Sequence, residues 1–493
     1  MTRRDSLLAM SLPALPLAAA APAGQDVCLL TACEIASLVR AGKISSRDVV
    51  AAHIRRIETV NPSVNAVVTL AADQAMEAAR LADERQARDK SALGPLHGLP
   101  ALHKDLVDTK GIRTTYGSPL FRDHVPSADA LIVRRMKQAG AITLGKTNTP
   151  EFGAGSQTFN KVFGTTKNPY NLEKTCGGSS GGAAVSLACR MTPLADGSDM
   201  GGSLRNPAAF CNVTGFRVSP GRVPSPEAAF AWSTLSTAGP MGRTVADVAL
   251  LLSAIAGPDA GSPLSLPEPG EVFRRPLGRD CKGIRVAWFK DLNGIPFEPR
   301  IRAVVDGHVK TFESLGCRVE QAEPDLTGTE FAFRTLRAWN SAHAHGAGVR
   351  SNPGAYKDTL RQEVEEGLRL SGEDVARAEA LHGQVWRRFQ EFLRKYEYFV
   401  LPATQLPPFD HRLPFPTAVH GVPVVNYIDW MKSCWYISTV ANPAISVPAG
   451  FTEDGLPVGL QIVGRWNADW SVLQLAHAFE QATGFGKRLP VVG

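Results

Sequence analysis

The stretch CGGSSGGAAVSLACRMTPLADGSDMGGSLR, residues 176–205, differs from the rest of the chain in its content of small residues. Residues 176–203 hold seven glycines, whereas the chain average of 45 in 493 predicts about two or three over this length. Glycine has no Cβ, so it lets backbone N–H groups turn inward without a clash. Clustered N–H groups stabilise the oxyanion formed in acyl transfer. The stretch therefore predicts two small-residue loops that place serines among backbone donors.

A lysine upstream of this stretch is a candidate for the base that a serine nucleophile needs. Residues 99–102 predict a short strand that ends at His103-Lys104-Asp105. A serine hydroxyl is a weak nucleophile on its own. A neutral lysine activates it in Ser-Lys catalysts, and burial favours the neutral amine. These features are compatible with acyl transfer, and a pair of ordinary flexible loops explains them equally well.

Two short motifs match known patterns but lack the structural context that each pattern requires. Residues 140–147 fit the phosphate-loop pattern, yet a charged helix is predicted before them and Asn148-Thr149-Pro150 disfavours a helix after them. Residues 177–181 fit the G-x-S-x-G elbow of α/β hydrolases, which needs a strand before the turn. Residues 171–176 are polar and poor in strand-forming side chains, so we predict no strand there and exclude the elbow.

Composition is that of a globular protein and excludes several functions. Of the 493 residues, 44% are hydrophobic and 20% are charged, which excludes wholesale disorder. The formal net charge is only +6, and no basic stripe with interleaved aromatic residues is present, so no nucleic-acid partner is expected. No two of the eight cysteines form a C-x-x-C motif. His343 and His345 have no acidic or cysteine cluster nearby, so we expect no metal and no cofactor.

Strand and helix patterns alternate along both ends of the chain. Strands are predicted at 141–144, 444–447 and 458–463, with helices at 128–138 and 470–483. This alternation predicts an α/β fold with a large mixed β-sheet core flanked by helices on both faces. Since both ends of the chain show the same alternation of strands and helices, residues 24–493 are predicted to form a single domain. Its highly charged helical segment, around 354–396, is predicted to be a solvated insertion.

Residues 1–23 have the three-part pattern of an export signal. Arg3 and Arg4 precede an Ala/Leu-rich run that ends in Ala21-Pro22-Ala23. Adjacent arginines are typical of the twin-arginine signal, which exports folded proteins. The apolar run is short and contains prolines, so a membrane-spanning helix is not expected. We therefore expect export, to the bacterial periplasm. A low-complexity N-terminus without this role is the alternative.

Several segments resemble the signature segments of the amidase signature family. The matching segments are GPLHGLPALHKD (94–105), GKTNTPEF (145–152), GGSSGG (177–182), DMGGSLRNPAAFCNVTGFRVSPGRVP (199–224), ANPAISVPAG (441–450) and GLPVGLQIVG (455–464). The resemblance extends over about residues 30–490, and the spacing of Ser179 and Ser203 matches the family. It implies the amidase signature fold and a serine amidohydrolase that works without a cofactor.

The resemblance also implies a role for individual residues. Ser203 corresponds to the nucleophile, Lys104 to the base, and Ser179, preceded by a cis peptide bond, to the bridge between them. The oxyanion hole corresponds to the backbone N–H groups of Met200, Gly201, Gly202 and Ser203. Ser180, Asp199 and Arg205 correspond to supporting positions. Met200 and Cys176 depart from the family pattern; the first contributes only its backbone, and the second is expected to be a spectator thiol.

Three functions follow from the resemblance. The first is an exported amidohydrolase, active as a monomer or homodimer on a small carboxamide, an aryl or alkyl amide, an ester or a carbamate. The alternative is the amidase component of a tRNA-dependent amidotransferase, which the export signal disfavours. The third is a fold kept only for binding, which the complete Lys and Ser set disfavours. Aromatic candidates for the substrate pocket are Phe230, Trp232, Tyr427, Trp430 and Trp435, although ordinary core packing explains them as well.

Overall fold

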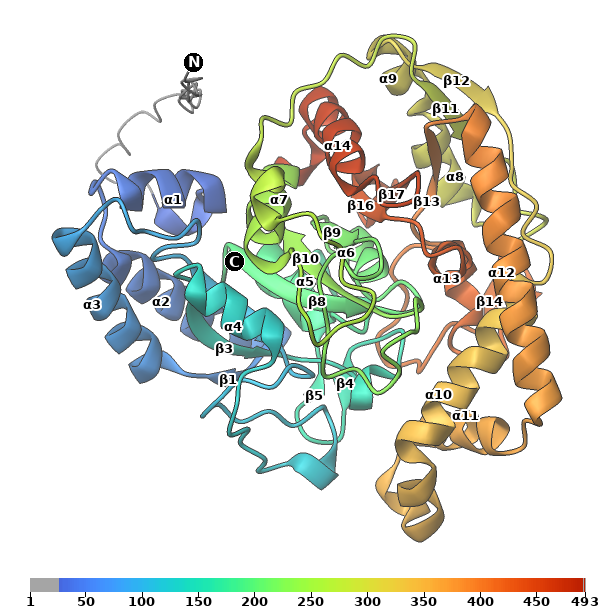
Figure 1. Cartoon of the computed structure of the whole chain (residues 1–493), viewed down its shortest axis with the longest axis horizontal. Helices are drawn as coiled ribbons and strands as arrows, with labels where there is room; N and C mark the ends of the chain where they lie inside the picture. The colour runs from blue at the N-terminus through green and yellow to red at the C-terminus, as the bar shows by residue number, and fades with distance from the viewer. Residues whose placement is uncertain (1–25, 491, 493) are drawn as a thin grey trace, which may run out of the picture.

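One large mixed sheet organises the fold. The computed structural model describes residues 26–490 and 492, so the predicted export signal lies outside the described residues. Within this part of the chain an 11-stranded sheet has the order β1-β3-β2-β8-β10-β9-β16-β17-β13-β11-β12 (Figure 1). Its strands are β1 (Val67–Leu70), β2 (Pro100–Lys104), β3 (Ile142–Thr147), β8 (Leu194–Asp199), β9 (Thr214–Arg217), β10 (Thr237–Gly242), β11 (Arg285–Trp288), β12 (Arg318–Gln321), β13 (Tyr398–Pro402), β16 (Ala444–Phe451) and β17 (Pro457–Gly464). Strand β2 is parallel to β3 and β8, and β11 is parallel to β12 and β13, whereas the remaining pairs are antiparallel.

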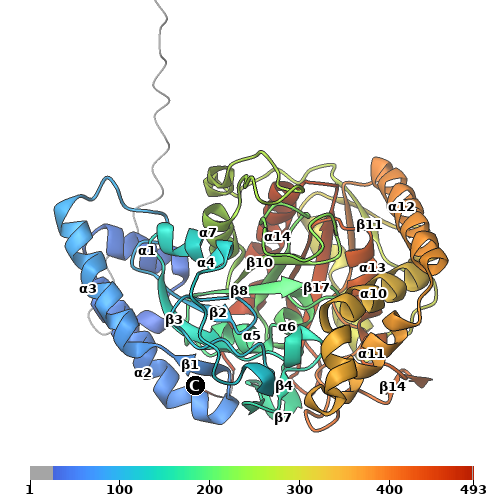
Figure 2. The ribbon, with the colours of Figure 1, turned by 60° about the horizontal axis from the view of Figure 1, so that its bottom comes forward.

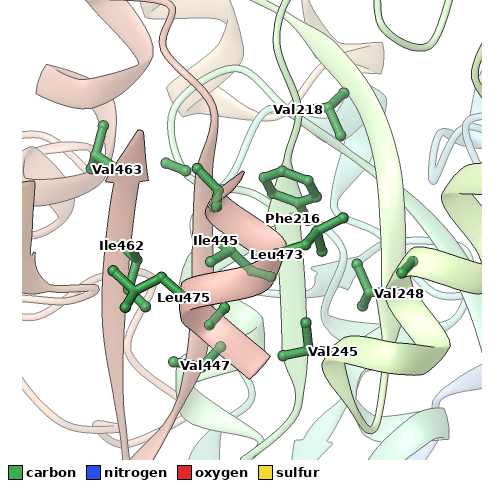
Figure 3. Close-up of a cluster of buried hydrophobic side chains, with 14 of the residues drawn as sticks. Phe216, Val218, Val245, Val248, Ile445, Val447, Ile462, Val463, Leu473 and Leu475 are labelled. Atoms are coloured by element: carbon green, nitrogen blue, oxygen red, sulfur yellow. The ribbon is translucent and has the colours of Figure 1, made fainter. Parts of the chain in front are cut away.

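Helices cover both faces of this sheet, which confirms the predicted architecture. One hydrophobic core includes side chains of α1 (Ala32–Arg40), α4 (Leu131–Gln138), α7 (Val245–Ile255) and α14 (Asp469–Thr483). A second core includes side chains of α2 (Ser46–Val64), α3 (Ala72–Arg88), α5 (Gly181–Ala188), α6 (Arg205–Phe210) and α13 (Lys432–Thr439). Figure 2 shows α7 and α14 on one side of the sheet and α5 and α6 on the other. In the first core, Phe216 and Ile445 from the sheet lie against Leu473 of α14 (Figure 3).

A group of helices rich in charged residues lies at one edge of the molecule. They are α10 (Thr329–Ser351), α11 (Asp358–Leu368) and α12 (Gly372–Lys395) (Figure 1). The helical pattern predicted at 354–396 corresponds to α11 and α12. Helix α10 was not predicted from the sequence, because Gly346 and Gly348, which lower helix propensity, lie within it. That this region is an insertion into a single domain stays a prediction.

The segment before the serine loop contains a strand that was not predicted. Strand β7 (Asn171–Thr175) pairs with β6 (Lys167–Asn168) in an antiparallel hairpin, so the prediction for 171–176 was wrong. Backbone hydrogen bonds make this pairing, so it does not require strand-forming side chains. The hairpin is separate from the 11-stranded sheet. The phosphate-loop match, by contrast, coincides with strand β3, as the sequence predicted.

Candidate active site

Lys104 meets the first serine loop inside the protein. It is the last residue of β2 and is fully buried. Its Nζ donates hydrogen bonds to Oγ of Ser179 (2.7 Å), Ser180 (2.9 Å) and Ser198 (3.1 Å). Among the described residues it forms no salt bridge. The amine therefore contacts hydroxyl groups and forms no direct ion pair with a carboxylate among the described residues.

The surroundings of Lys104 favour its neutral form near neutral pH. Burial lowers the pKa of Lys104 from 10.5 to about 7, although the carboxylates of Asp199 and Asp196 act in the opposite direction. A group with a pKa near the operating pH is suited to accept a proton and return it. That Lys104 acts as a neutral base stays a prediction.

The loop that carries Ser179 is held by a side chain of α6. Asn206 Nδ2 donates to the carbonyl of Gly178, and the N–H of Gly178 donates to Asn206 Oδ1 (2.9 Å). The Gly178–Ser179 peptide bond is cis, as the resemblance implied. A Cβ on Gly178 would lie 2.9 Å from the backbone carbonyl carbon of Gln157, so glycine is required for this close approach.

A buried ion pair organises the second loop. Arg205 donates to both carboxylate oxygens of Asp199, at 3.0 and 2.9 Å, and Arg217 donates to the same residue. Asp199 in turn accepts the N–H groups of Gly202 (2.9 Å) and Leu204 (3.1 Å). Burial raises the pKa of Asp199, but the two guanidinium groups outweigh it and hold the pKa well below its usual range. The charged carboxylate thus fixes the backbone on both sides of Ser203.

This arrangement corrects the predicted oxyanion hole at Gly202. Because its N–H donates to Asp199, it is not available to an oxyanion in this structure. The N–H groups of Met200, Gly201 and Ser203 make no hydrogen bond within the described part of the chain. Gly202 is nevertheless required, because its φ is +117° and a Cβ there would lie 2.4 Å from Cβ of Cys434.

A backbone hydrogen bond joins Ser203 to the loop whose serines contact Lys104. The N–H of Ser180 donates to the carbonyl of Ser203 (3.2 Å). No hydrogen bond between described residues links the hydroxyls of Ser179 and Ser203, so the predicted bridge is present on its Lys104 side only. Ser203 is 9% exposed and so is not completely buried.

Most of the predicted pocket aromatics do not line the site. Trp232 is 76% exposed, so its side chain does not enclose a substrate pocket. Trp430 is fully buried, stacks on Phe210 at 5.4 Å and donates to Ser156 Oγ, so it belongs to the core. Tyr427 is buried and bonds to Arg337 and Glu363.

Two further aromatic candidates contact other elements. Phe230 packs on Trp339 and His343 of α10. Trp435 stacks on Phe333 of α10. A Cβ on Gly201 would lie 3.6 Å from the Cβ of Trp435. Of the five aromatic candidates, Trp435 is therefore the one shown to border the second loop.

Comparison with known proteins decides the family. The family model for Amidase matches residues 48–473. A solved bacterial aryl acylamidase, described as one of the amidase signature enzymes, has a TM-score of 0.88 and 28% identity over 95% of this chain and 100% of that chain. The chain belongs to the amidase signature family. This amidase is a hydrolase of amide C–N bonds.

Two curated relatives match nearly the whole amidase. An acylamidase from Rhodococcus erythropolis is 36% identical over 471 residues, which cover 94% of this chain and 98% of the relative. A glutamyl-tRNA(Gln) amidotransferase subunit from Moorella thermoacetica is also 36% identical, over 94% of this chain and 99% of the relative. A solved 6-aminohexanoate cyclic dimer hydrolase has a TM-score of 0.82 and 25% identity, over 94% of this chain and 99% of that chain.

Sequence analysis of the amidase missed some polar residues of the site. Ser198 contacts Lys104, Asn206 holds Gly178, and Arg217 is the second cation on Asp199. Asn206 and Arg217 lie within the segment 199–224 that carries the resemblance, yet their roles depend on contacts between distant strands and helices. Cys176, as expected, is not a reactive thiol, because burial raises its pKa to about 12.

Two negative findings over the described residues concern metal binding and membrane crossing. Over residues 26–490, no group of three or more His, Cys, Asp or Glu side chains is placed to hold a metal ion. In the same range no helix has the length and apolar character needed to cross a membrane. A surface hollow of about 680 Å³ lies between α3 and β3, but Lys104, Ser179 and Ser203 do not line it.

Proposed function

We propose that Lys104, Ser179 and Ser203 are the catalytic triad of this amidase, with Ser203 as the nucleophile. The observation that carries the proposal is the buried Lys104 amine, which contacts Ser179 at 2.7 Å and has a pKa of about 7. A serine needs a base to become nucleophilic. No other described group combines this burial, this pKa and this contact with a serine.

The proposed reaction passes through an acyl-enzyme. Neutral Lys104 accepts the proton of Ser179 as Ser179 accepts that of Ser203, whose Oγ forms a bond to the amide carbon. The N–H groups of Met200, Gly201 and Ser203 stabilise the oxyanion. The C–N bond then breaks as the proton returns through Ser179 to the leaving amine. Water attacks the ester by the same proton path and releases a carboxylic acid.

The triad is tested by replacing its members with side chains that lack the reacting group. Ser203→Ala and Lys104→Ala are each expected to lower kcat/KM for an activated anilide by at least about 10³-fold. Ser186→Ala is the matched control, because Ser186 is a buried serine whose hydroxyl only donates to Gly182 within α5. Full activity of either triad variant would show that the assignment is wrong.

We infer that the substrate is a small amide with an apolar or aromatic group. A Cβ on Gly153 would lie 3.6 Å from Oγ of Ser179, so the 151–153 turn lies beside the triad. Phe152 of this turn packs on His345 and Tyr356, with ring centroids 4.5 and 6.0 Å apart, respectively. Aromatic side chains supply large apolar contact area to a ligand. The names acylamidase and aryl acylamidase among the relatives support the same substrate class.

A panel of anilides, alkyl amides, primary carboxamides, esters and carbamates tests this substrate class. Release of amine or alcohol is measured for each compound. We expect kcat/KM for the anilides to exceed that for acetamide, and Phe152→Ala to reduce this preference. Equal rates for anilides and acetamide, or an unchanged preference in Phe152→Ala, would contradict the proposal.

The second candidate function is that of an amidotransferase component, which the 36% identical relative from Moorella thermoacetica favours. Such a component would release ammonia from glutamine or asparagine for a partner. We favour the free-standing hydrolase, a monomer or homodimer without nucleic acid. Light scattering of the purified protein and ammonia release from glutamine distinguish the two. Slow anilide hydrolysis together with rapid glutamine hydrolysis would favour the amidotransferase.

We also propose that residues 1–23 direct export to the bacterial periplasm. The pattern of Arg3, Arg4 and the Ala-rich run supports this, and the proposal rests on sequence alone. N-terminal sequencing of the protein from its native cells is the test. An N-terminus near residue 24 in the periplasmic fraction is expected. An intact Met1 in the cytoplasmic fraction would contradict it.

A further inference from the structure

A buried histidine and aspartate lie directly beside the residue that carries the amine. Asp196 of β8 and His103 of β2 are both almost completely buried. One carboxylate oxygen of Asp196 accepts the backbone N–H of Lys104 (2.9 Å), and the other bonds to Nδ1 of His103. Nε2 of His103 bonds to Oγ1 of Thr143 on β3 (3.1 Å). Three neighbouring strands are therefore tied together at the base of Lys104.

The carboxylate occupies the place where a strand partner would be. The parallel ladder between β2 and β8 pairs Ala101 with Leu194 and Leu102 with Ala195 and then stops. Beyond this point the N–H of Lys104 is accepted by Asp196. An unpaired buried N–H is costly, so Asp196 completes the backbone bonding at the residue that must be held still.

We propose that Asp196, held by His103, is a positioning residue that fixes Lys104 and sets the pH at which its amine becomes neutral. The proposal rests on the assignment of Lys104 as the base. A carboxylate near a lysine favours the ammonium form. The carboxylates of Asp199 and Asp196 favour the charged form of Lys104, and those of Asp105 and Asp196 favour the charged form of the buried Lys146.

The test compares two isosteric changes that each remove one buried negative charge. In Asp196→Asn the amide oxygen still accepts the N–H of Lys104, and the amide NH2 donates to Nδ1 of His103 once the ring proton moves to Nε2, so both contacts are kept and the charge is lost. The acidic limb of the kcat/KM profile is expected to move to lower pH by about one pH unit. In Asp105→Asn, where the carboxylate bonds Thr115 and is not among the charges acting on Lys104, the limb is expected to stay in place.

A second variant keeps the proposal testable if Asp196→Asn does not fold. His103→Phe removes the donor that offsets the Asp196 carboxylate, so the limb is expected to move to higher pH. Folding is checked by circular dichroism and thermal unfolding. An unmoved limb in a folded Asp196→Asn or His103→Phe protein would overturn the proposal. Full activity of Lys104→Ala would overturn the triad itself, whereas an inactive Lys104→Ala with an unmoved Asp196→Asn limb overturns this inference alone.

Discussion

Replacing Lys104 with methionine is expected to abolish activity and, at neutral pH, to stabilise the fold. Lys104 is fully buried, and its pKa falls from 10.5 in the unfolded chain to about 7 in the folded protein. This corresponds to a penalty of about 5 kcal/mol for holding the amine in the folded protein at or below pH 7. Methionine removes the penalty but leaves three hydroxyl groups without this partner, at about 1 kcal/mol each.

The pH dependence of the difference in stability between Lys104→Met and the wild type is a more discriminating measurement than its size at one pH. Between pH 7 and pH 10.5 the unfolded chain binds one proton more than the folded protein at Lys104, so the free energy of unfolding rises with pH. The penalty is complete below pH 7 and disappears above about pH 10.5. The advantage of Lys104→Met over the wild type should therefore shrink by about 1.4 kcal/mol per pH unit.

Urea unfolding at about pH 7.5, 8.5 and 9.5 measures this slope. From the lowest to the highest of these pH values the difference between the two proteins should change by about 2.7 kcal/mol. Lys43→Met is the control, because the same substitution there removes an exposed amine and not a buried one. A difference between Lys104→Met and wild type that stays flat over this range would refute a lowered pKa for Lys104.

Three further substitutions test other parts of the structure. Asp199→Asn leaves two buried guanidinium groups without their carboxylate and should lower the free energy of unfolding by about 3–5 kcal/mol in urea titrations. Gly202→Ala forces a Cβ against Cys434 and should reduce kcat/KM by about 10²-fold, while Gly372→Ala, in open space, should leave it unchanged. Trp232→Ala should change the free energy of unfolding by less than about 0.5 kcal/mol and leave kcat unchanged, because the side chain is exposed.

Local patterns in the sequence were enough to predict the main elements. The strand predicted at 458–463 corresponds to β17, and the helix predicted at 470–483 corresponds to α14. Alternation of strands and helices predicted the layered architecture. The sequence misjudged β7 and missed α10, among other elements, where polar residues or glycines weaken the local signal and pairing with distant segments supplies the stability.

The chemistry of the site was predictable as an inventory but not as a geometry. The glycine clusters and the strand that ends at Lys104 are local patterns, so they pointed to a serine loop and a candidate base. Which N–H groups are free is not local, because the Asp199 carboxylate that takes the N–H of Gly202 is fixed by Arg205 and Arg217. The same holds for the aromatic candidates, of which Trp435 alone is shown to border the second loop, since composition does not distinguish a core ring from a pocket ring.

The resemblance of the signature segments thus indicated the family, and the sequence located the two serine loops and the candidate base Lys104. The state of that lysine depends on parts of the chain that are far apart in sequence. Ser179 and Ser180 contact its amine from 75 and 76 residues away, and Asp196 accepts its N–H from 92 residues away. A pKa depends on the burial and charges that folding brings together, and these exist only once the sheet has formed.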